Sequence, residues 1–365
     1  MNDFFRTPLK LIPNRVYRPF IGGKLLDKWQ GKSVAKDGQY SEEWVASTVT
    51  ARSENPIPFE GLSQVCNVAH PGVYLKDLIT ENPEAFLGKK HTAKFGTSPA
   101  LLVKVLDSCS RLMIQVHPDQ NFARKAFQSE FGKTEAWYVI GGRSIQGENP
   151  YVLFGFKPGV TRERWMELFE TQNVAGMISA LHRFEVKPGD VFLVEGGIPH
   201  AAGAGVFFIE VQEPTDYTIR TERITPNRLC LADEQLHQGL GLKKMFDCFH
   251  YHGYSREEVL ERWHSYESLV HEEQSGKLFS VISPEKCAYF WVERLEIQGK
   301  YTKPGTGSFA IAIVLSGSGM IVWEQGSIEV EQACEIFLPA GLTEVTWENQ
   351  SRAPMVVILC HPPLT

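Results

Sequence analysis

Short runs of apolar residues, separated by turn-forming residues, dominate the first two thirds of the chain. They are rich in Val, Ile, Phe and Tyr, and Gly, Pro, Asp or Ser bounds most of them, which is typical of β-strands. Two segments have helical spacing instead, residues 161–169 and 255–263, and Ser255 stands as an N-cap before two acidic residues. Strands are predicted over residues 101–105, 112–116, 137–140, 151–156, 191–194 and 206–211.

From about residue 276 the pattern consists of strands and turns alone. Residues 308–315 and 320–323 are expected to form consecutive antiparallel strands, and the series continues to residue 359. Closely spaced short strands of this kind are typical of a jelly-roll sandwich. We therefore expect a mainly β protein with domains at 1–235 and 276–365, joined by a small helical connector at 236–275.

Composition narrows the classes of partner. The length of 365 residues suits two domains, and the formal charge of −6 leaves no basic surplus to attract nucleic acid or anionic lipid. Seven scattered cysteines without a C-x-x-C pair favour reduced thiols and a cytoplasmic location. The first six residues lack the pattern of a signal peptide, and the longest apolar run is too short for a membrane helix.

A candidate metal pair ends the predicted strand 112–116. Gln115 and His117 are two residues apart, so they face the same side of a strand, and Pro118 ends that strand. An amide oxygen beside an imidazole nitrogen suits a borderline divalent ion such as zinc. The alternative is a hydrogen-bonded histidine at a strand end.

Two further segments carry candidate ligands. Glu135 leads into an apolar strand two residues after Lys133, and a buried carboxylate is costly unless it is paired or metal-bound. The alternative is a Lys–Glu pair on the surface. Downstream, Gly196 and Gly197 follow a buried strand and allow a tight bend that would direct His200 inward.

A polar group follows the predicted strand 206–211. Glu210 and Gln212 share one strand face, and Asp216 and Arg220 come next. The planar guanidinium of Arg220 could pair with a phosphate or carboxylate of a ligand. An internal salt bridge from Arg220 to Asp216 or Glu210 is the alternative.

These segments together resemble a known family. Residues 189–200 resemble the second metal-binding motif of cupins, with Glu195 in place of the usual proline. From about residue 17 to 361 the chain resembles the short bacterial form of type I mannose-6-phosphate isomerases. The resemblance is carried, in order and approximate spacing, by Phe20 to Leu25, Glu42-Glu43-Trp44, Lys104 to Leu106, Gln115 to Asp119, Gly132 to Glu135, Pro199 to Ala201, Glu210, Asp216 and Arg220.

The resemblance implies two cupin-type jelly rolls, of which the first holds one zinc ion per chain. It implies interconversion of mannose 6-phosphate and fructose 6-phosphate by a monomer or homodimer. The positions that match the family's zinc ligands are Gln115, His117, Glu135 and His200. The positions that match residues lining its active site are Lys104, Lys133, Glu210, Asp216 and Arg220.

Moving a carbonyl between two carbons requires a proton transfer through a cis-enediol, which a metal beside both oxygens stabilises. Lys133 or Glu210 is the candidate base. Met113 stands where the family usually has a serine associated with the substrate phosphate, and a thioether cannot donate a hydrogen bond. An isomerase of an unphosphorylated sugar, and a non-catalytic cupin that binds a sugar or sugar phosphate as a sensor, are therefore alternatives. A metal-dependent dioxygenase fits less well, because the glutamine ligand is unusual at such sites.

The last third of the chain offers less chemistry. Residues 339–344 repeat the cupin spacing with Glu344 in place of histidine, so the second jelly roll is expected to be structural and metal-free. The residues His250-Tyr251-His252 have strand spacing without a carboxylate nearby in sequence, which favours a surface or packing role.

Overall fold

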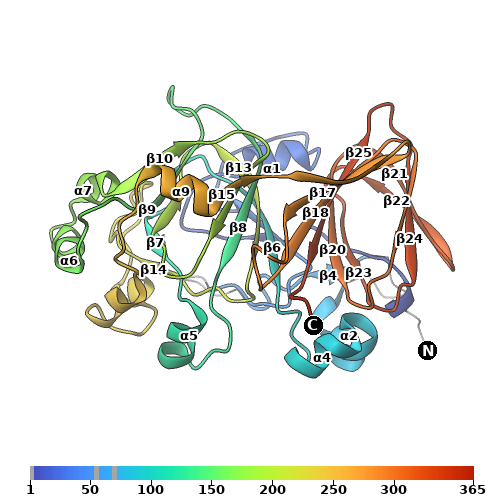
Figure 1. Cartoon of the computed structure of the whole chain (residues 1–365), viewed down its shortest axis with the longest axis horizontal. Coiled ribbons are helices and arrows are strands. Elements are labelled where there is room, and N and C mark those ends of the chain that lie inside the picture. The colour runs from blue at the N-terminus through green and yellow to red at the C-terminus, as the bar shows by residue number, and fades with distance from the viewer. Residues whose placement is uncertain (1–3, 53–56, 68–71) are drawn as a thin grey trace.

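The computed structural model describes residues 4–52, 57–67 and 72–365; residues 1–3 of the segment assessed for a signal peptide lie outside them. The chain is mainly β, as expected, and its four large sheets are all antiparallel. These sheets stand side by side along the long axis of the molecule (Figure 1). We number them I to IV from left to right in that view.

Sheets I and II form the N-terminal half. Sheet I has the order β10 (Leu181–Glu185), β9 (Tyr151–Phe156), β12 (His200–Ala202), β7 (Gln115–Val116) and β14 (Ile219–Arg220). Sheet II has the order β15 (His264–Tyr266), β11 (Asp190–Val194), β8 (Glu135–Gly142), β13 (Val206–Gln212), β6 (Leu102–Asp107), β3 (Glu42–Val45) and β2 (Arg15–Val16).

Sheets III and IV form the other half. Sheet III has the order β1 (Leu9–Lys10), β23 (Glu335–Leu338), β20 (Ala310–Ser316), β25 (Met355–His361), β18 (Trp291–Ile297), β17 (Gly276–Ile282) and β16 (Ser268–Glu273). Sheet IV has the order β19 (Lys300–Pro304), β24 (Glu344–Asn349), β21 (Ser318–Trp323) and β22 (Gly326–Glu331). A separate small sheet pairs β4 (Gln64–Val65) with β5 (Val73–Tyr74).

Three apolar layers lie between the four sheets. Trp137 and Phe208 of sheet II pack toward sheet I, whereas Ile209 of sheet II packs with Ile313 of sheet III. A third layer around Trp347 joins sheets III and IV. Sheet II is therefore covered on both faces, which explains why its strands are near-continuous apolar runs. The buried charged residues of these strands that face sheet I are exceptions to this apolar pattern.

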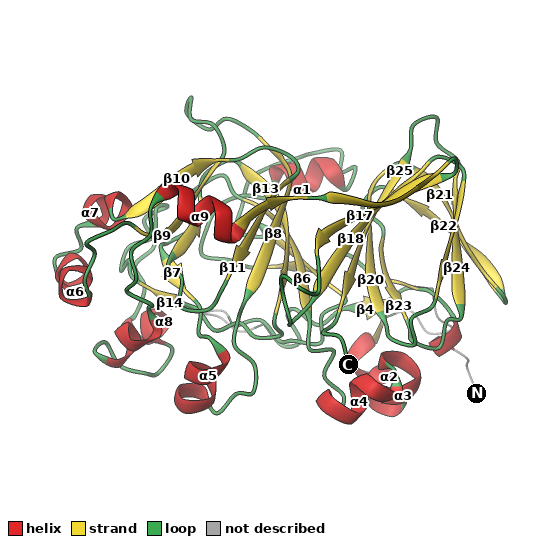
Figure 2. Cartoon of the chain, in the orientation of Figure 1, coloured by secondary structure: helices red, strands yellow, loops and turns green. Residues whose placement is uncertain are grey.

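Helices lie near the ends of the strands and beyond the outer side of sheet I (Figure 2). The short α6 and α7 pack with residues of sheet I in one apolar cluster. The α-helices are α1 (Lys24–Trp29), α2 (Leu75–Glu81), α3 (Pro83–Leu87), α4 (Lys89–Phe95), α5 (Gln120–Phe127), α6 (Arg162–Glu170), α7 (Val174–Ser179), α8 (Asp233–His237) and α9 (Arg256–Trp263). The 3₁₀-helices are η1 (Phe4–Arg6) and η2 (Lys244–Cys248). Within the described ranges, no helix is both long and apolar enough to cross a membrane.

Several local expectations need correction. The predicted strand 112–116 is a strand only at Gln115–Val116, and β20 and β21 lie in different sheets rather than pairing with each other. The connector 236–275 is only partly helical, because β15 and β16 occupy much of its second half. These two strands extend sheets II and III, so the chain passes between the halves as a strand rather than as a helix.

The N-terminal segment also crosses the expected domain limit. Leu9 of β1 pairs with Phe337 of β23, so residues near the start of the chain belong to a sheet built mostly from its end. The helices α2 to α4 lie beside the same half in Figure 1. Such pairings are set by long-range packing, which local sequence patterns do not encode.

The helix α9 offers a direct test of local structure. Ser255 Oγ accepts a hydrogen bond from Glu258 N at 3.1 Å, and Glu258 Oε2 accepts one from Ser255 N at 2.6 Å. The predicted N-cap is therefore in place, and Glu258 completes it as a capping box. We expect Ser255→Ala to lower the free energy of unfolding by about 1 kcal/mol. Urea denaturation measures the change, and Ser255→Asp, which retains an accepting oxygen, should recover most of it.

Candidate metal centre and active site

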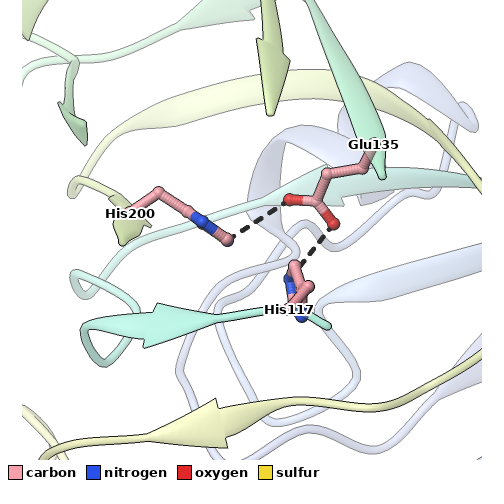
Figure 3. Close-up of side chains that lie close together, drawn as sticks. All are labelled: His117, Glu135 and His200. Carbon is pink, nitrogen blue, oxygen red and sulfur yellow. Dashed lines mark ion pairs between the residues drawn. The ribbon is translucent and has the colours of Figure 1, made fainter. Parts of the chain in front are cut away.

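Three strands from two sheets bring the candidate metal ligands together. His200 in β12 is paired with Gln115 in β7, both in sheet I, and His117 follows directly after β7. Glu135 begins β8 in sheet II and points at both imidazoles across the gap between the sheets (Figure 3). Residues separated by up to 85 positions in sequence thus meet at one point.

The side chains of this cluster lie close together and are shielded from solvent. His117 Nε2 lies 3.2 Å from Glu135 Oε2, and His200 Nε2 lies 3.4 Å from Glu135 Oε1. The two imidazole centroids are 4.7 Å apart, and all three side chains are fully buried. Gln115 Nε2 lies 3.4 Å from His200 Nε2, which places the amide beside the same point.

Each imidazole is oriented by a backbone carbonyl. His117 Nδ1 donates to the carbonyl of Tyr217 at 2.8 Å, and His200 Nδ1 donates to that of Ile198 at 2.8 Å. Both Nε2 lone pairs are then available to the cluster. Burial, with help from Lys133, lowers the pKa of His117 to about 3, and burial also lowers the pKa of His200. Both rings are neutral at pH 7, as metal ligands must be.

The carboxylate of Glu135 supplies the negative charge. Burial favours the protonated acid, but the neighbouring Lys133 outweighs it and holds the pKa of Glu135 well below its usual range. Its Oε1 is buried and has no hydrogen-bond partner among the described residues. A carboxylate, two neutral imidazoles and an amide form a donor set that fits a borderline divalent cation.

A row of paired charged side chains extends from the metal-ligand cluster along sheet II. Lys133 Nζ lies 2.6 Å from Glu135 Oε2 and 3.9 Å from Glu210 Oε1, and Lys104 Nζ lies 3.1 Å from Glu210 Oε1. All four side chains are buried. Burial and the neighbouring Glu135 raise the pKa of Glu210. Although burial opposes it, Glu210 and Glu42 raise the pKa of Lys104.

A second group of charged side chains surrounds Arg18. Arg18 Nε lies 2.6 Å from Glu42 Oε2, and Arg18 Nη1 lies 3.3 Å from Asp216 Oδ2. Burial opposes ionisation, but Arg18 and Lys104 lower the pKa of Asp216, which is an anion at pH 7. Arg220 Nη1 donates to the carbonyl of Gln235 at 2.9 Å.

Except for Glu135, the charged side chains of these two groups line one pocket, and a second pocket adjoins it. Met113, Gln115, Lys133 and Glu210 are among the residues of the first. The second, of about 350 Å³, shares Arg18 and Arg220 with the first and adds Arg52. The metal cluster therefore adjoins a space with both acidic and basic groups.

Comparisons with known proteins agree with this geometry. Residues 27–135 match the family model for the catalytic domain of type I phosphomannose isomerase. Mannose-6-phosphate isomerase ManA of Bacillus subtilis (strain 168) is 30% identical over 293 residues, which cover 79% of this chain and 83% of that protein. The chain belongs to the type I mannose-6-phosphate isomerase family.

Solved structures of mannose 6-phosphate isomerases share the fold. The crystal structure of the Bacillus subtilis enzyme superimposes with a TM-score of 0.73 at 24% identity, covering 97% of this chain and 99% of that one. A zinc-bound mannose 6-phosphate isomerase superimposes with a TM-score of 0.72 at 15% identity, covering 98% and 100%. The recognition of a type I mannose-6-phosphate isomerase from sequence motifs is thereby confirmed.

The structure brings all nine residues singled out from the sequence to this one region of the isomerase fold. The individual roles assigned to them stay predictions. The alternative of a surface Lys133–Glu135 pair is wrong, because both side chains are buried. Glu210 and Gln212 share one strand face, as parity predicted, and both are buried.

Three charged residues that line these pockets were not predicted as site residues from the sequence. Arg18 and Arg52 were not singled out, because an arginine outside a motif carries no local signal. Glu42 was quoted only as part of a motif, although it contacts Arg18. His250 also has a carboxylate beside it that its sequence neighbourhood did not indicate: its Nε2 lies 3.2 Å from Asp119 Oδ2, although the two residues are 131 positions apart.

Proposed function

We propose that this chain is a zinc-dependent isomerase that interconverts mannose 6-phosphate and fructose 6-phosphate. The observation that carries the proposal is the buried His117–Glu135–His200 cluster beside a pocket of paired lysines and carboxylates. The names of the relatives support the reaction, and the zinc-bound structure supports the metal. We propose one zinc ion per chain.

The residues that would hold the metal are Gln115, His117, Glu135 and His200. When bound, zinc would act as a Lewis acid toward the oxygens on the first two carbons of the sugar. The protein's own contribution is to keep both imidazoles neutral and oriented while excluding water from the cluster.

The proton must move between the first two carbons through a cis-enediol. Glu210 and Lys133 are the candidate bases, and the raised pKa of Glu210 makes its carboxylate a stronger base than an ordinary glutamate. Lys104 holds Glu210 in place through the 3.1 Å ion pair. We propose that Arg220 and Asp216 bind substrate oxygens and assist ring opening.

A phosphorylated substrate is favoured over a free sugar despite Met113. The thioether cannot donate a hydrogen bond, but the adjoining pocket carries Arg18, Arg52 and Arg220. Guanidinium groups are well suited to bind phosphate. We propose that an anionic sugar, rather than a neutral one, is the substrate.

Metal analysis combined with a substrate panel tests this proposal. We expect about one zinc per purified chain, activity lost with a chelator and restored by zinc, and kcat/KM for mannose 6-phosphate at least ~100-fold above that for mannose, equivalent to about 3 kcal/mol of transition-state binding. A coupled assay that detects fructose 6-phosphate gives the rates. Preference for the free sugar would favour the unphosphorylated alternative, and binding without turnover would favour a sensor.

The finer architecture and cell biology also remain proposals. We propose that sheets I and II form one cupin-type jelly roll and sheets III and IV a second one without metal. Their limits lie near 1–235 and 276–365, except that β1 joins the second unit, β15 the first and β16 the second. The seven cysteines are free, which supports a cytoplasmic location. We predict that the protein is a monomer or a homodimer.

A further inference from the structure

Lys133 contacts two of the candidate metal ligands directly. Its Nζ lies 2.8 Å from His117 Nε2 and 2.6 Å from Glu135 Oε2. Those two atoms are the ones that these residues would offer to a metal ion. The lysine is 3% exposed, so its ammonium group has little access to water. It is instead stabilised by the candidate ligand atoms themselves.

An ammonium group and a divalent ion cannot share these two atoms. Zinc bonds to imidazole nitrogen and carboxylate oxygen are ~2 Å long, and each ligand lone pair serves one partner at a time. The repulsion between the two cations is also strong in a buried site, where water does not screen it. A metal held by His117 and Glu135 therefore requires Lys133 to leave them.

The surroundings provide a place for the displaced group. Among the described residues, Glu210 is the other carboxylate within 4 Å of Lys133 Nζ, at 3.9 Å. A displacement of the ammonium from Glu135 toward Glu210 would keep it paired with a buried carboxylate. Lys104 already contacts Glu210 Oε1, and the second carboxylate oxygen of Glu210 can accept Lys133.

We infer that Lys133 is an internal competitor of the metal, which the metal displaces from His117 and Glu135 toward Glu210. This inference rests on the proposed metal site and adds to it a residue that sets the affinity of that site. Binding energy spent on moving Lys133 lowers the apparent metal affinity. The same movement delivers Lys133 to the carboxylate that is a candidate base.

The test compares zinc dissociation constants, measured by competition with a chromophoric chelator, for the wild-type protein and three variants. Lys133→Met removes the competitor while keeping the length of the side chain. Lys133→Arg keeps a positive charge at the same position. Lys104→Met is the matched control, because it removes an equally buried positive charge that pairs with Glu210 but forms no ion pair with the metal ligands in the described part of the chain.

We expect Lys133→Met to bind zinc ~10–100-fold more tightly than the wild-type protein, the range over which neighbours of metal ligands alter affinity. This gain should exceed that of Lys104→Met by about tenfold. Lys133→Arg should bind zinc no more tightly than the wild type. If Lys133→Met folds only with zinc, the rate of zinc loss to excess chelator replaces the equilibrium measurement and should be lower than in the wild type by a similar factor.

Equal affinities in the wild type and both Lys133 variants, or equal gains in Lys133→Met and Lys104→Met, would overturn the inference while leaving the metal site in place. Tighter zinc binding by Lys133→Arg would overturn it as well. A wild-type protein that binds no zinc would instead contradict the proposed function itself. The two failures are therefore distinguishable in one experiment.

Discussion

Replacing His200 with alanine is expected to abolish metal binding and to lower kcat/KM for mannose 6-phosphate by about 10²–10³-fold or more. The imidazole is fully buried, its Nδ1 is held by the carbonyl of Ile198, and its Nε2 faces Glu135 Oε1. The variant removes one of two neutral nitrogen donors, and nothing in the described part of the site replaces it. Metal content after dialysis and the initial rate in a coupled assay measure both effects.

His361 provides a matched control for this experiment. It is also buried, and its Nε2 contacts a carboxylate, Glu293 Oε2, at 3.0 Å, but it lies in sheet III. His361→Ala should keep its metal, and it should change activity only through stability. Full activity of His200→Ala in metal-free buffer would contradict the proposed metal site.

Replacing Glu335 with glutamine is expected to stabilise the protein at alkaline pH by about 1–3 kcal/mol, the cost of burying an unpaired charge-bearing group. Glu335 begins β23 between sheets II and III, and neither of its carboxylate oxygens has a hydrogen-bond partner in the described part of the chain. Burial and the neighbouring Glu43 raise the pKa of Glu335 well above its ordinary value. The folded protein therefore retains a proton on this group that the unfolded chain releases.

The sign of the pH dependence follows from that difference. Because the folded protein binds more protons than the unfolded chain, the contribution of Glu335 to stability is complete below the ordinary glutamate pKa of ~4.5 and is lost as pH rises toward the folded pKa. The advantage of Glu335→Gln should therefore be larger at pH 8 than at pH 5. Urea denaturation at both values, with zinc saturating throughout, measures it.

Glu331 is a suitable control for this prediction because it is exposed and lies four residues earlier in the chain. Glu331→Gln should leave the free energy of unfolding nearly unchanged at both pH values. An advantage of Glu335→Gln that is equal at pH 5 and pH 8, or absent at pH 8, would show that the carboxyl of Glu335 is not protonated by burial.

The strand pattern shows how far local sequence determines this fold. The run 151–156 was predicted with its observed limits, and α9 begins after Ser255 because Ser255 and Glu258 satisfy each other's backbone groups. By contrast, residues 112–114 have a strand-like composition but do not form a strand, because no strand pairs with them. Local propensity identifies a segment that can form a strand, whereas a partner strand decides whether it does.

The candidate site shows the same division. The residue types at Gln115, His117, Glu135 and His200 indicate a candidate metal site, because a buried carboxylate needs a counter-charge and amide and imidazole groups suit a borderline divalent ion. The contact of Arg18 with Asp216 spans 198 positions in sequence, so no local pattern could reveal it. Neither could a pattern show that Lys133 reaches His117 Nε2 as well as Glu135.

The sequence by itself determined the family, the mainly β class and the chemical identity of the groups that can hold a metal, because these depend on residue type and on spacing along one strand. The tertiary structure alone decided which strands share a sheet, how β1 and β16 join the two halves, and which charges meet in the pocket. The physical reason is that burial and pairing energies depend on distances between segments far apart in the chain. Those distances exist only after the sheets have packed.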